Sequence, residues 1–386
     1  MPKLITTEKL PIKMWLTDIE AGALEQVRNI ANFPFAFHHV AVMPDVHEGY
    51  GMPIGGVLAT KEVIIPNAVG VDIGCGVSAQ KTSLNELDVP VLKALMSGIR
   101  KIIPLGFNKH KKEQSSELMP SLEVKDACIT REWTKALKSL GSLGGGNHFI
   151  EIQKGSDGHV WIMLHSGSRN LGKQVADYYN RLAKVECREK GYADLVKQDL
   201  AFLKLESQIG QNYFKEMRFC LDYALANRKL MMERVKRVFD SQIKGIAWGE
   251  FINIAHNYAA RETHFGEEVI VHRKGATQAL AGQTGIVPGS QGTESYIVRG
   301  LGNPESFSSC SHGAGRRLGR NQAIRELNLK EEIAKLDKQG IVHALRTKND
   351  LDEACGAYKD ITQVMRLQAD LVQITTELKP LAVIKA

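Results

Sequence analysis

The chain has 386 residues, of which 43% are hydrophobic and 24% charged, as is typical of a soluble globular protein. Its net charge of +7 is a modest excess that points only weakly to a polyanionic partner. No apolar run approaches the roughly 20 residues that a membrane-spanning helix needs, and the N-terminus lacks a secretory signal. The six cysteines show no paired spacing, so we expect a reduced, cytoplasmic setting.

The elements that the apolar pattern predicts alternate between strands and helices. Short runs rich in β-branched or aromatic residues predict strands. Longer stretches with apolar residues at helical spacing predict helices, several of them between 171 and 239. In chain order we expect a strand at 37–43, a helix at 90–103, a strand at 160–164, the helices of 171–239, strands at 269–272 and 295–298, a helix at 361–378, and a strand or extended tail at 380–386.

The segment Gly-Val-Asp-Ile-Gly-Cys-Gly at 70–76 is the most informative stretch. It places Asp72 and Cys75 three positions apart, and the glycines around them permit tight or left-handed backbone that aims both side chains at one point. A hard oxygen ligand and a soft sulfur ligand at this spacing suggest a metal site. The alternative is a buried cysteine in a glycine-rich turn.

Four later polar segments each contain a histidine. His148 follows three glycines whose N–H groups can bind an anion, and a structured loop entering a strand is expected there. His165 ends a predicted strand, and the guanidinium of Arg169 can fork onto phosphate, although Ser168 or Asn170 can equally cap a following helix.

The other two histidines have contrasting surroundings. His256 lies in the helix-compatible stretch 253–257. It is a candidate metal ligand because the other candidates form a set, and its own sequence neighbours give no such indication. His312 is flanked by Gly313 and Ala314, so no bulky neighbour blocks attack, and histidine can form covalent intermediates. The alternative for His312 is a position at a helix N-terminus.

The polar segments extend over most of the chain. They therefore favour a single catalytic domain over residues 1–386, of α/β (α+β) class with mixed sheets and a mainly helical insertion at about 171–245. The ligand-type residues, with His312 left aside, are Asp72, Cys75, His148, His165 and His256. Five such residues are more than a tetrahedral structural zinc uses, and they suit one or two catalytic ions. Manganese and zinc both remain open on residue types alone.

Two basic clusters are further candidates for contact with phosphates. One is Lys109, Lys111 and Lys112 beside His110, and the other is Arg316, Arg317 and Arg320. The second has more promising neighbours. Residues 109–131 and 340–357 contain no recognisable motif.

In seven segments the chain resembles the RtcB family of RNA-splicing ligases. They occur in the order found in that family, cover nearly the full length, and as an ordered set are highly specific. They are Met-Pro-Asp-Val-His-Glu-Gly at 43–49, the segment at 70–76, Gly-Asn-His-Phe-Ile-Glu at 146–151, Leu-His-Ser-Gly-Ser-Arg at 164–169, Ala-His-Asn at 255–257, Pro-Gly-Ser at 288–290 and Cys-Ser-His-Gly-Ala-Gly-Arg at 310–316.

The resemblance implies a role for each matched residue. His312 matches the nucleophile that accepts GMP, and residues implicated in handling the RNA end are Arg169, Arg316 and Asp45. The ligands of two Mn²⁺ ions would be Asp72, Cys75, His148, His165 and His256. The implied GTP-binding residues are Asn147, His148, Phe149, Ile150, Glu151, His256, Asn257, Pro288, Gly289, Ser290, Gln291, Ser295, His312, Gly313, Ala314, Gly315 and Lys385.

The implied activity is GTP- and Mn²⁺-dependent joining of RNA ends in tRNA splicing or RNA repair. A 3′-phosphate or 2′,3′-cyclic phosphate end is joined to a 5′-hydroxyl end, and some members need an accessory activating protein. One alternative is a metal-dependent phosphodiesterase that opens RNA cyclic-phosphate ends without ligation. A non-enzymatic RNA-binding protein with a structural metal is the third possibility.

Overall fold

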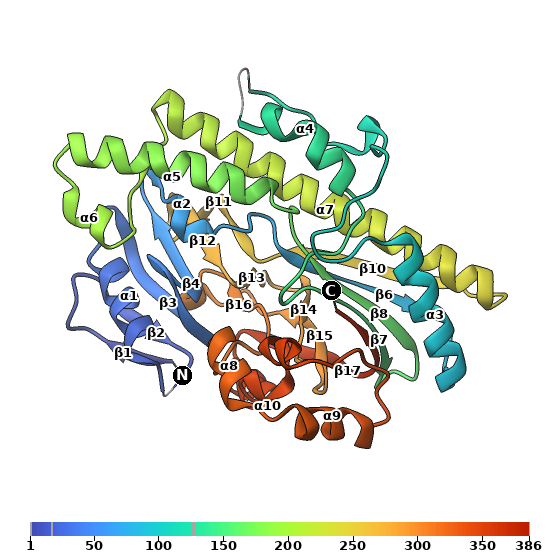
Figure 1. Ribbon diagram of the computed structural model, residues 1–386. Helices are drawn as coiled ribbons and strands as arrows, with labels where there is room; N and C mark the ends of the chain where they lie inside the picture. Colours follow the sequence, from blue (N-terminus) through green and yellow to red (C-terminus); the bar gives the residue numbers. More distant parts are fainter. Residues whose placement is uncertain (1, 17, 125–127, 386) are drawn as a thin grey trace.

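Two β-sheets form the framework of the computed structural model, which describes residues 2–16, 18–124 and 128–385 (Figure 1). The first has the strand order β1-β2-β3-β4-β12-β11, in which β2 and β3 pair in parallel and the other neighbouring strands pair antiparallel. Its strands are β1 (Lys3–Ile5), β2 (Ile12–Met14), β3 (Ala36–Tyr50), β4 (Met52–Thr60), β11 (Asn257–His264) and β12 (Glu267–Lys274).

The second sheet is antiparallel and has the order β10-β6-β8-β7-β17-β15-β14. Two small ribbons pair β13 (Ala276–Gln278) with β16 (Ser309–Ser311) and β5 (Val63–Ile64) with β9 (Leu203–Lys204). The second sheet contains β6 (Gly76–Thr82), β7 (Phe149–Gly155), β8 (Val160–Ser166), β10 (Trp248–Ala255), β14 (Thr284–Val287), β15 (Ser295–Gly300) and β17 (Val372–Ile384).

Helices cover the sheets, and the long helix α7 runs across the top of both in Figure 1. The 3₁₀ turns are η1 (Ser116–Leu118), η2 (Pro304–Ser306), η3 (Lys348–Glu353) and η4 (Cys355–Ala357). The α-helices are α1 (Ala21–Ala31), α2 (Pro66–Val69), α3 (Val89–Ile102), α4 (Cys128–Ser139), α5 (Leu171–Glu189), α6 (Ala193–Lys197), α7 (Gln208–Gln242), α8 (Arg320–Glu326), α9 (Leu329–Lys338) and α10 (Ile361–Leu367).

Alternation along the strands separates a helix-covered face from an inner face. In β8, Ile162 and Leu164 pack in the core shared with α3 and α7, whereas Trp161 and Met163 pack on the opposite face. Successive side chains of a strand point to opposite faces, so His165 shares the inner face with Met163. The face of β8 that carries His165 is therefore the one turned away from the core shared with α3 and α7.

Most of the predicted elements are confirmed. Strands contain 37–43, 160–164, 269–272 and 295–298, and α3 covers almost all of 90–103. The stretch 171–239 is helical as predicted, in α5, α6 and α7, with the short strand β9 between α6 and α7. The presence of helices and sheets throughout the chain confirms the α/β class.

Two helix predictions are wrong. The stretch 361–378 contains only α10, and from Val372 the chain enters β17, which pairs with β15 and β7 in the middle of the second sheet. Residues 253–257 are strand rather than helix, divided between β10 and β11 at His256. In β17 the alternating Val372, Ile374 and Thr376 pair with β15, and residues 253–255 pair with β6, which in both places outweighs local helical preference.

A buried ion pair stabilises the first sheet where β11 meets β12. The guanidinium of Arg273 is buried and forms two bonds with Glu262, Nη1–Oε1 at 2.5 Å and Nη2–Oε2 at 2.9 Å. Burial alone would raise the pKa of Glu262, but the charge of Arg273 and the hydrogen bonds from His264 and Arg273 lower it to about 2. A depressed carboxyl pKa means that the folded state gains stability from ionised Glu262.

We therefore expect Glu262→Gln to lower the free energy of unfolding by about 3–5 kcal/mol, because it leaves a buried guanidinium without its counter-charge. The native contribution is fully present above the unfolded pKa of about 4.5 and is lost as the pH falls toward 2. Urea titrations between pH 3 and 7 measure this slope, which the variant should lack. Glu268→Gln is the control, because its 3.0 Å pair with Arg261 is exposed and should contribute less than about 1 kcal/mol.

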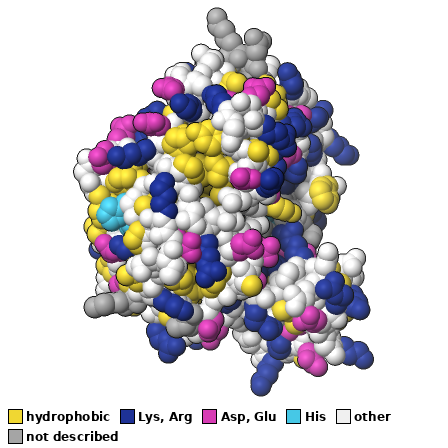
Figure 2. All heavy atoms as spheres, turned by 90° about the vertical axis from the view of Figure 1, so that its left-hand side faces the viewer, with side chains coloured by type: hydrophobic (Ala, Val, Ile, Leu, Met, Phe, Trp, Pro, Cys, Tyr) yellow, Lys and Arg dark blue, Asp and Glu magenta, His cyan; other side chains and the backbone are white. Residues whose placement is uncertain are grey.

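The surface facing left in Figure 1 carries charges of both signs, with Lys and Arg side chains denser toward the upper right of the view in Figure 2. Among the described residues, no helix is long and apolar enough to cross a membrane.

Candidate active site

The predicted metal ligands come together where the two sheets meet. Cys75 directly precedes β6, His148 directly precedes β7, and His165 lies near the end of β8, so neighbouring strands of the second sheet carry all three. His256 is the single residue between β10 of the second sheet and β11 of the first. Its backbone N–H donates to the Cys75 carbonyl at 2.9 Å, which ties it to the others.

The ligand atoms lie within a few ångströms of one another. Cys75 Sγ is 3.4 Å from His148 Nε2 and 3.3 Å from His165 Nε2, and Asp72 Oδ2 is 3.3 Å from His148 Nε2. The His165 and His256 ring centroids are 5.2 Å apart. Such separations suit donor atoms that share a cation. The structure thus brings the five residues into one cluster.

The electrostatics of the cluster also fit a cation. Burial would raise the pKa of Asp72, but hydrogen bonding to His148 and its charge lower it to about 2, so the carboxylate is ionised. Burial and neighbouring imidazoles hold the pKa of His165 and His256 well below the usual range, which leaves both rings neutral. His256 Nδ1 is buried without a hydrogen-bond partner among the described residues. Neutral imidazoles, a carboxylate and a thiol are ligands for a divalent transition metal.

Two glycines allow this approach of side chains. A Cβ at Gly144 would collide with the imidazole of His148, and one at Gly167 would collide with the carboxylate of Asp72. Beneath the cluster, buried Arg228 donates from Nη1 to the carbonyls of Gly74 (2.9 Å) and Ser166 (2.8 Å). Arg228 was not predicted, because nothing in its helical sequence context distinguishes it from a surface arginine.

His312 follows β16 and lies beside the cluster. Its ring centroid is 4.8 Å from that of His256, and its Nδ1 bonds to Asp45 Oδ2 at 2.6 Å. The same oxygen accepts from the backbone N–H groups of His312 (3.0 Å) and Gly313 (3.3 Å). With Nδ1 held by a carboxylate, Nε2 is the ring nitrogen that remains for chemistry.

Asp45 lies in β3 and is fully buried, with a relative exposure of 0%. Burial would raise its pKa, but the charges of His312 and Lys359 and the His312 hydrogen bond lower it below its usual range. A buried carboxylate bonded to His312 differs from the expected contact between Asp45 and an RNA end. The contact joins residues 267 positions apart, so no local pattern signals it.

Several predicted nucleotide residues lie in loops and strand ends next to His312. The N–H of Ala314 donates to the Pro288 carbonyl at 3.0 Å, which joins the loop after β14 to the loop after β16. The N–H of Gly289 donates to Ser295 Oγ at 3.1 Å. Glu151 lies on the inner face of β7, and burial raises its pKa to about 8, partly offset by the charge of Lys385.

Three further nucleotide candidates contact the glycine loop or the metal-ligand residues. Lys385 Nζ donates to the Gly146 carbonyl at 3.4 Å, and the carbonyl of Asn147 lies 3.2 Å from His165 Nδ1. The amide of Asn257 donates to the Asp72 carbonyl at 3.2 Å.

Glu353 is a second residue that the sequence did not reveal. It ends η3 in a stretch without a motif, yet its carboxylate meets Arg316 Nη1 at 3.1 Å, Arg320 Nε at 3.2 Å and Lys385 Nζ at 3.4 Å. The hydroxyl of Tyr358 also donates to it. Its carboxylate side chain is only 4% exposed, so one buried carboxylate holds three cationic side chains from two other segments of the chain.

A cavity of about 410 Å³ opens beside this carboxylate, lined by Arg100, Gly146, Gln291, Ala344, Leu345, Asn349, Asp350, Asp352, Glu353, Val383 and Lys385. Two of these, Gln291 and Lys385, are predicted nucleotide residues.

Arg169 borders the glycine loop at Gly144, whereas Lys385 contacts it at Gly146. Its Nε donates to Ser142 Oγ at 3.0 Å and its Nη2 to the Gly106 carbonyl at 2.6 Å. A Cβ at Gly144 would touch Arg169 Nη1 as well as His148. Arg169 is therefore adjacent to the metal-ligand cluster, whereas Arg316 is directed at Glu353.

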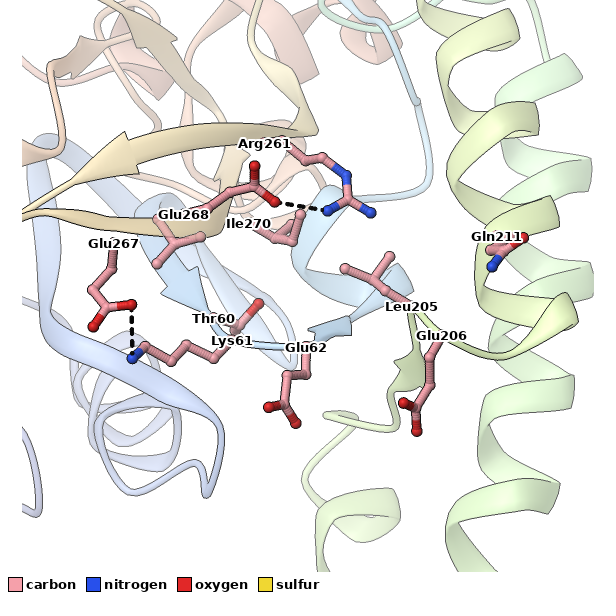
Figure 3. Close-up of a pocket in the computed structure, with 11 residues that line it drawn as sticks. Thr60, Lys61, Glu62, Leu205, Glu206, Gln211, Arg261, Glu267, Glu268 and Ile270 are labelled. Carbon is pink, nitrogen blue, oxygen red and sulfur yellow. Dashed lines mark hydrogen bonds and ion pairs between the residues drawn. The ribbon is translucent and has the colours of Figure 1, made fainter.

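A larger cavity, about 580 Å³, lies elsewhere (Figure 3). Its wall includes the exposed pairs Lys61–Glu267 (3.4 Å) and Arg261–Glu268 (3.0 Å) and contains none of the predicted site residues. The residues that line this cavity therefore give no reason to connect it with the active site.

Comparison with known proteins identifies the family. The tRNA-splicing ligase RtcB family matches residues 26–131 and 119–386. The chain is 41% identical to RNA-splicing ligase RtcB of Escherichia coli K12, with 99% of each chain covered. It is 33% identical to tRNA-splicing ligase RtcB of Nanoarchaeum equitans, covering 97% of this chain and 95% of the relative. The chain therefore belongs to the RtcB family of RNA-splicing ligases.

Proposed function

We propose that the protein is a GTP- and Mn²⁺-dependent RNA ligase. It joins RNA ends bearing a 3′-phosphate or 2′,3′-cyclic phosphate to 5′-hydroxyl ends, in tRNA splicing or RNA repair. The observation that carries the proposal is His312, whose Nδ1 is held by buried Asp45 while its ring lies against the metal-ligand cluster. Family membership supports the same activity.

His312 acts as the nucleophile in the first step. Asp45 accepts a hydrogen bond from Nδ1–H, which leaves the Nε2 lone pair free to attack the α-phosphorus of GTP. An N–P bond forms, the bond to the β-phosphate oxygen breaks, and pyrophosphate leaves. The product is GMP linked to His312 as a phosphoramidate.

Two transfers to RNA follow. An oxygen of the RNA 3′-phosphate attacks the phosphorus of the adduct, the N–P bond breaks, and an RNA-(3′)pp(5′)G end forms. The 5′-hydroxyl oxygen of the second RNA then attacks the activated 3′-phosphate, releases GMP and gives up its proton to solvent. Arg169, beside the cluster, is positioned to hold the terminal phosphate through its free N–H groups.

Asp72, Cys75, His148, His165 and His256 would hold the two Mn²⁺ ions, which when bound neutralise charge that develops on phosphate oxygens. On the nucleotide side, Glu151, Ser295 and Lys385 supply polar groups for a guanine base, with Ser290 and Gln291 in the neighbouring loop.

We also propose a domain organisation, a cellular location and partners for the protein. Strands of the first sheet and helices α5 and α7 share one hydrophobic cluster, which supports a single catalytic domain with a helical insertion. All six cysteines are free thiols, which supports a reducing, cytoplasmic location. The partners would be RNA with the ends named above and an accessory activating protein.

The decisive experiment incubates the protein with α-labelled GTP and Mn²⁺. We expect acid-labile, base-stable label on the wild type, mapped by peptide mass spectrometry to His312, and none on His312→Ala. His159→Ala, in the turn between β7 and β8, is the control and should retain full labelling. End opening without GTP and without joined product would support the phosphodiesterase instead.

Glu353→Gln tests the carboxylate that holds Arg316, Arg320 and Lys385. Loss of the charge frees these side chains from their fixed positions, and we expect GTP affinity to fall by about 10–100-fold, as for other groups that orient ligands indirectly. Asp352→Asn is the control, because this neighbour lines the same cavity but forms no ion pair among the described residues. Calorimetric titration with GTP measures both. Tighter binding in the Gln variant would mean that Glu353 competes with the nucleotide instead.

A further inference from the structure

The turn that follows α3 exposes an aromatic ring at the edge of the active site. Phe107 is fully exposed, at 101% against 70% for Tyr50, the next most exposed large hydrophobic side chain among the described residues. It lies within a turn closed by the N–H of Asn108 on the Leu105 carbonyl at 3.1 Å, and Gly106 supplies the left-handed conformation (φ +64°). Turn positions are normally polar, so an unpartnered ring here suggests a ligand.

The turn is fastened to the active site rather than loosely placed. Leu143 donates its N–H to the Pro104 carbonyl at 2.9 Å, and Leu105 forms a parallel bridge with Leu143. Arg169 Nη2 donates to the Gly106 carbonyl at 2.6 Å, and the same guanidinium borders Gly144 next to His148. Phe107 is therefore one residue from the group that anchors Arg169.

Three lysines follow Phe107 closely in the sequence. Lys109, Lys111 and Lys112 are all exposed, and none forms an ion pair with any residue that the structure describes. His110, between them, is fixed: its N–H donates to the Lys138 carbonyl at 2.9 Å, and its Nε2 lies 2.7 Å from Arg234 Nη1. The lysines thus project from an anchored backbone.

An exposed ring followed by unpaired cations is the combination that binds single-stranded nucleic acid. Bases of any sequence stack on aromatic faces, and lysines follow the phosphate backbone. We propose that Phe107 stacks on a base near the end of the RNA strand whose terminal phosphate Arg169 holds, while Lys109, Lys111 and Lys112 contact the phosphates further along. This inference rests on the proposed function, because it places the RNA relative to Arg169.

The test uses a short single-stranded RNA with a 3′-phosphate and 2-aminopurine at its penultimate position. Phe107→Ala should raise the Kd and the KM for RNA by about 10–100-fold and abolish the quenching of 2-aminopurine on binding. Phe107→Trp should restore both, because it retains an aromatic face. Guanylylation of His312 involves no RNA and should stay at the wild-type rate in every variant.

The lysines and a matched control complete the design. Replacing Lys109, Lys111 and Lys112 together by Gln should weaken RNA binding and flatten its dependence on salt concentration, because fewer counterions are released. Leu280→Ala removes another exposed apolar side chain, at the turn between β13 and β14, and should change nothing.

The outcomes separate the two proposals. If Phe107→Ala binds RNA with unchanged affinity and still quenches 2-aminopurine, the proposed stacking site is wrong. The exposed ring would then be a candidate contact for a protein partner. Absence of label on His312 in the wild type would overturn the ligase mechanism, while the binding measurements would still decide whether Phe107 contacts RNA.

Discussion

Asp45→Asn should reduce the rate at which His312 accepts GMP by about 10²–10⁴-fold. The carboxylate fixes the tautomer of the imidazole by accepting a hydrogen bond from Nδ1–H at 2.6 Å, and it stabilises positive charge that develops on the ring as Nε2 attacks. An asparagine can turn its amide NH₂ toward Nδ1, which would favour the opposite tautomer and occupy Nε2 with the proton. In the comparable serine-protease triad this change costs about four orders of magnitude.

Single-turnover labelling with α-labelled GTP measures this effect directly. The same carboxylate oxygen accepts from the backbone N–H groups of His312 and Gly313, so an amide NH₂ in its place would also leave these two donors unpaired, and the stability of the variant is measured alongside its chemistry. Thermal unfolding and Mn²⁺ affinity close to those of the wild type would show that the loss is chemical. Labelling within threefold of the wild type would mean that Asp45 does not orient the nucleophile.

The polar motifs and their order in the chain predicted most of the residues of the site. They did not predict which motifs contact one another. Asp72, Cys75, His148, His165 and His256 were predicted as ligands, and the structure brings their side chains together. The pairing of Asp45 with His312 and the role of Glu353 depend on tertiary contacts between distant segments. Neither has a signal within its own stretch of sequence.

The same distinction explains the fold predictions. Runs such as 160–164 combine β-branched, aromatic and other apolar residues, so the local pattern alone predicts the strand that the structure contains. The stretch 361–378 begins with a real helix, α10, and the change to β17 is decided by pairing with β7 and β15, which lie far away in the sequence. Helix α3, in contrast, is predicted well because its start is local: Asp88 accepts from the Val91 N–H at 2.9 Å, and Pro90 occupies the first turn.

Cys75→Ser should weaken Mn²⁺ binding by at least about 100-fold and reduce RNA joining accordingly, with a smaller effect on folding. The thiol lies 3.3–3.4 Å from two imidazole nitrogens, at the centre of the cluster rather than in the hydrophobic core. A serine hydroxyl fills nearly the same space but is a far poorer anionic ligand, because it does not deprotonate as a thiol does when a cation binds. Loss of a first ligand should exceed the 10–100-fold typical of a group that only orients ligands.

Cys187→Ser separates metal binding from the general cost of losing a buried thiol. Cys187 is a buried free cysteine of α5 whose sulfur contacts Phe202 backbone groups, remote from the predicted ligands in sequence and packed in the helix-covered core. Its serine variant should be destabilised by a similar amount in metal-free buffer and still bind Mn²⁺ like the wild type. Calorimetric Mn²⁺ titration of the three proteins, with thermal unfolding measured in chelator, gives both quantities. If Cys75→Ser binds Mn²⁺ as tightly as Cys187→Ser, the sulfur is not a ligand, and the cation must be held by Asp72 and the imidazoles alone.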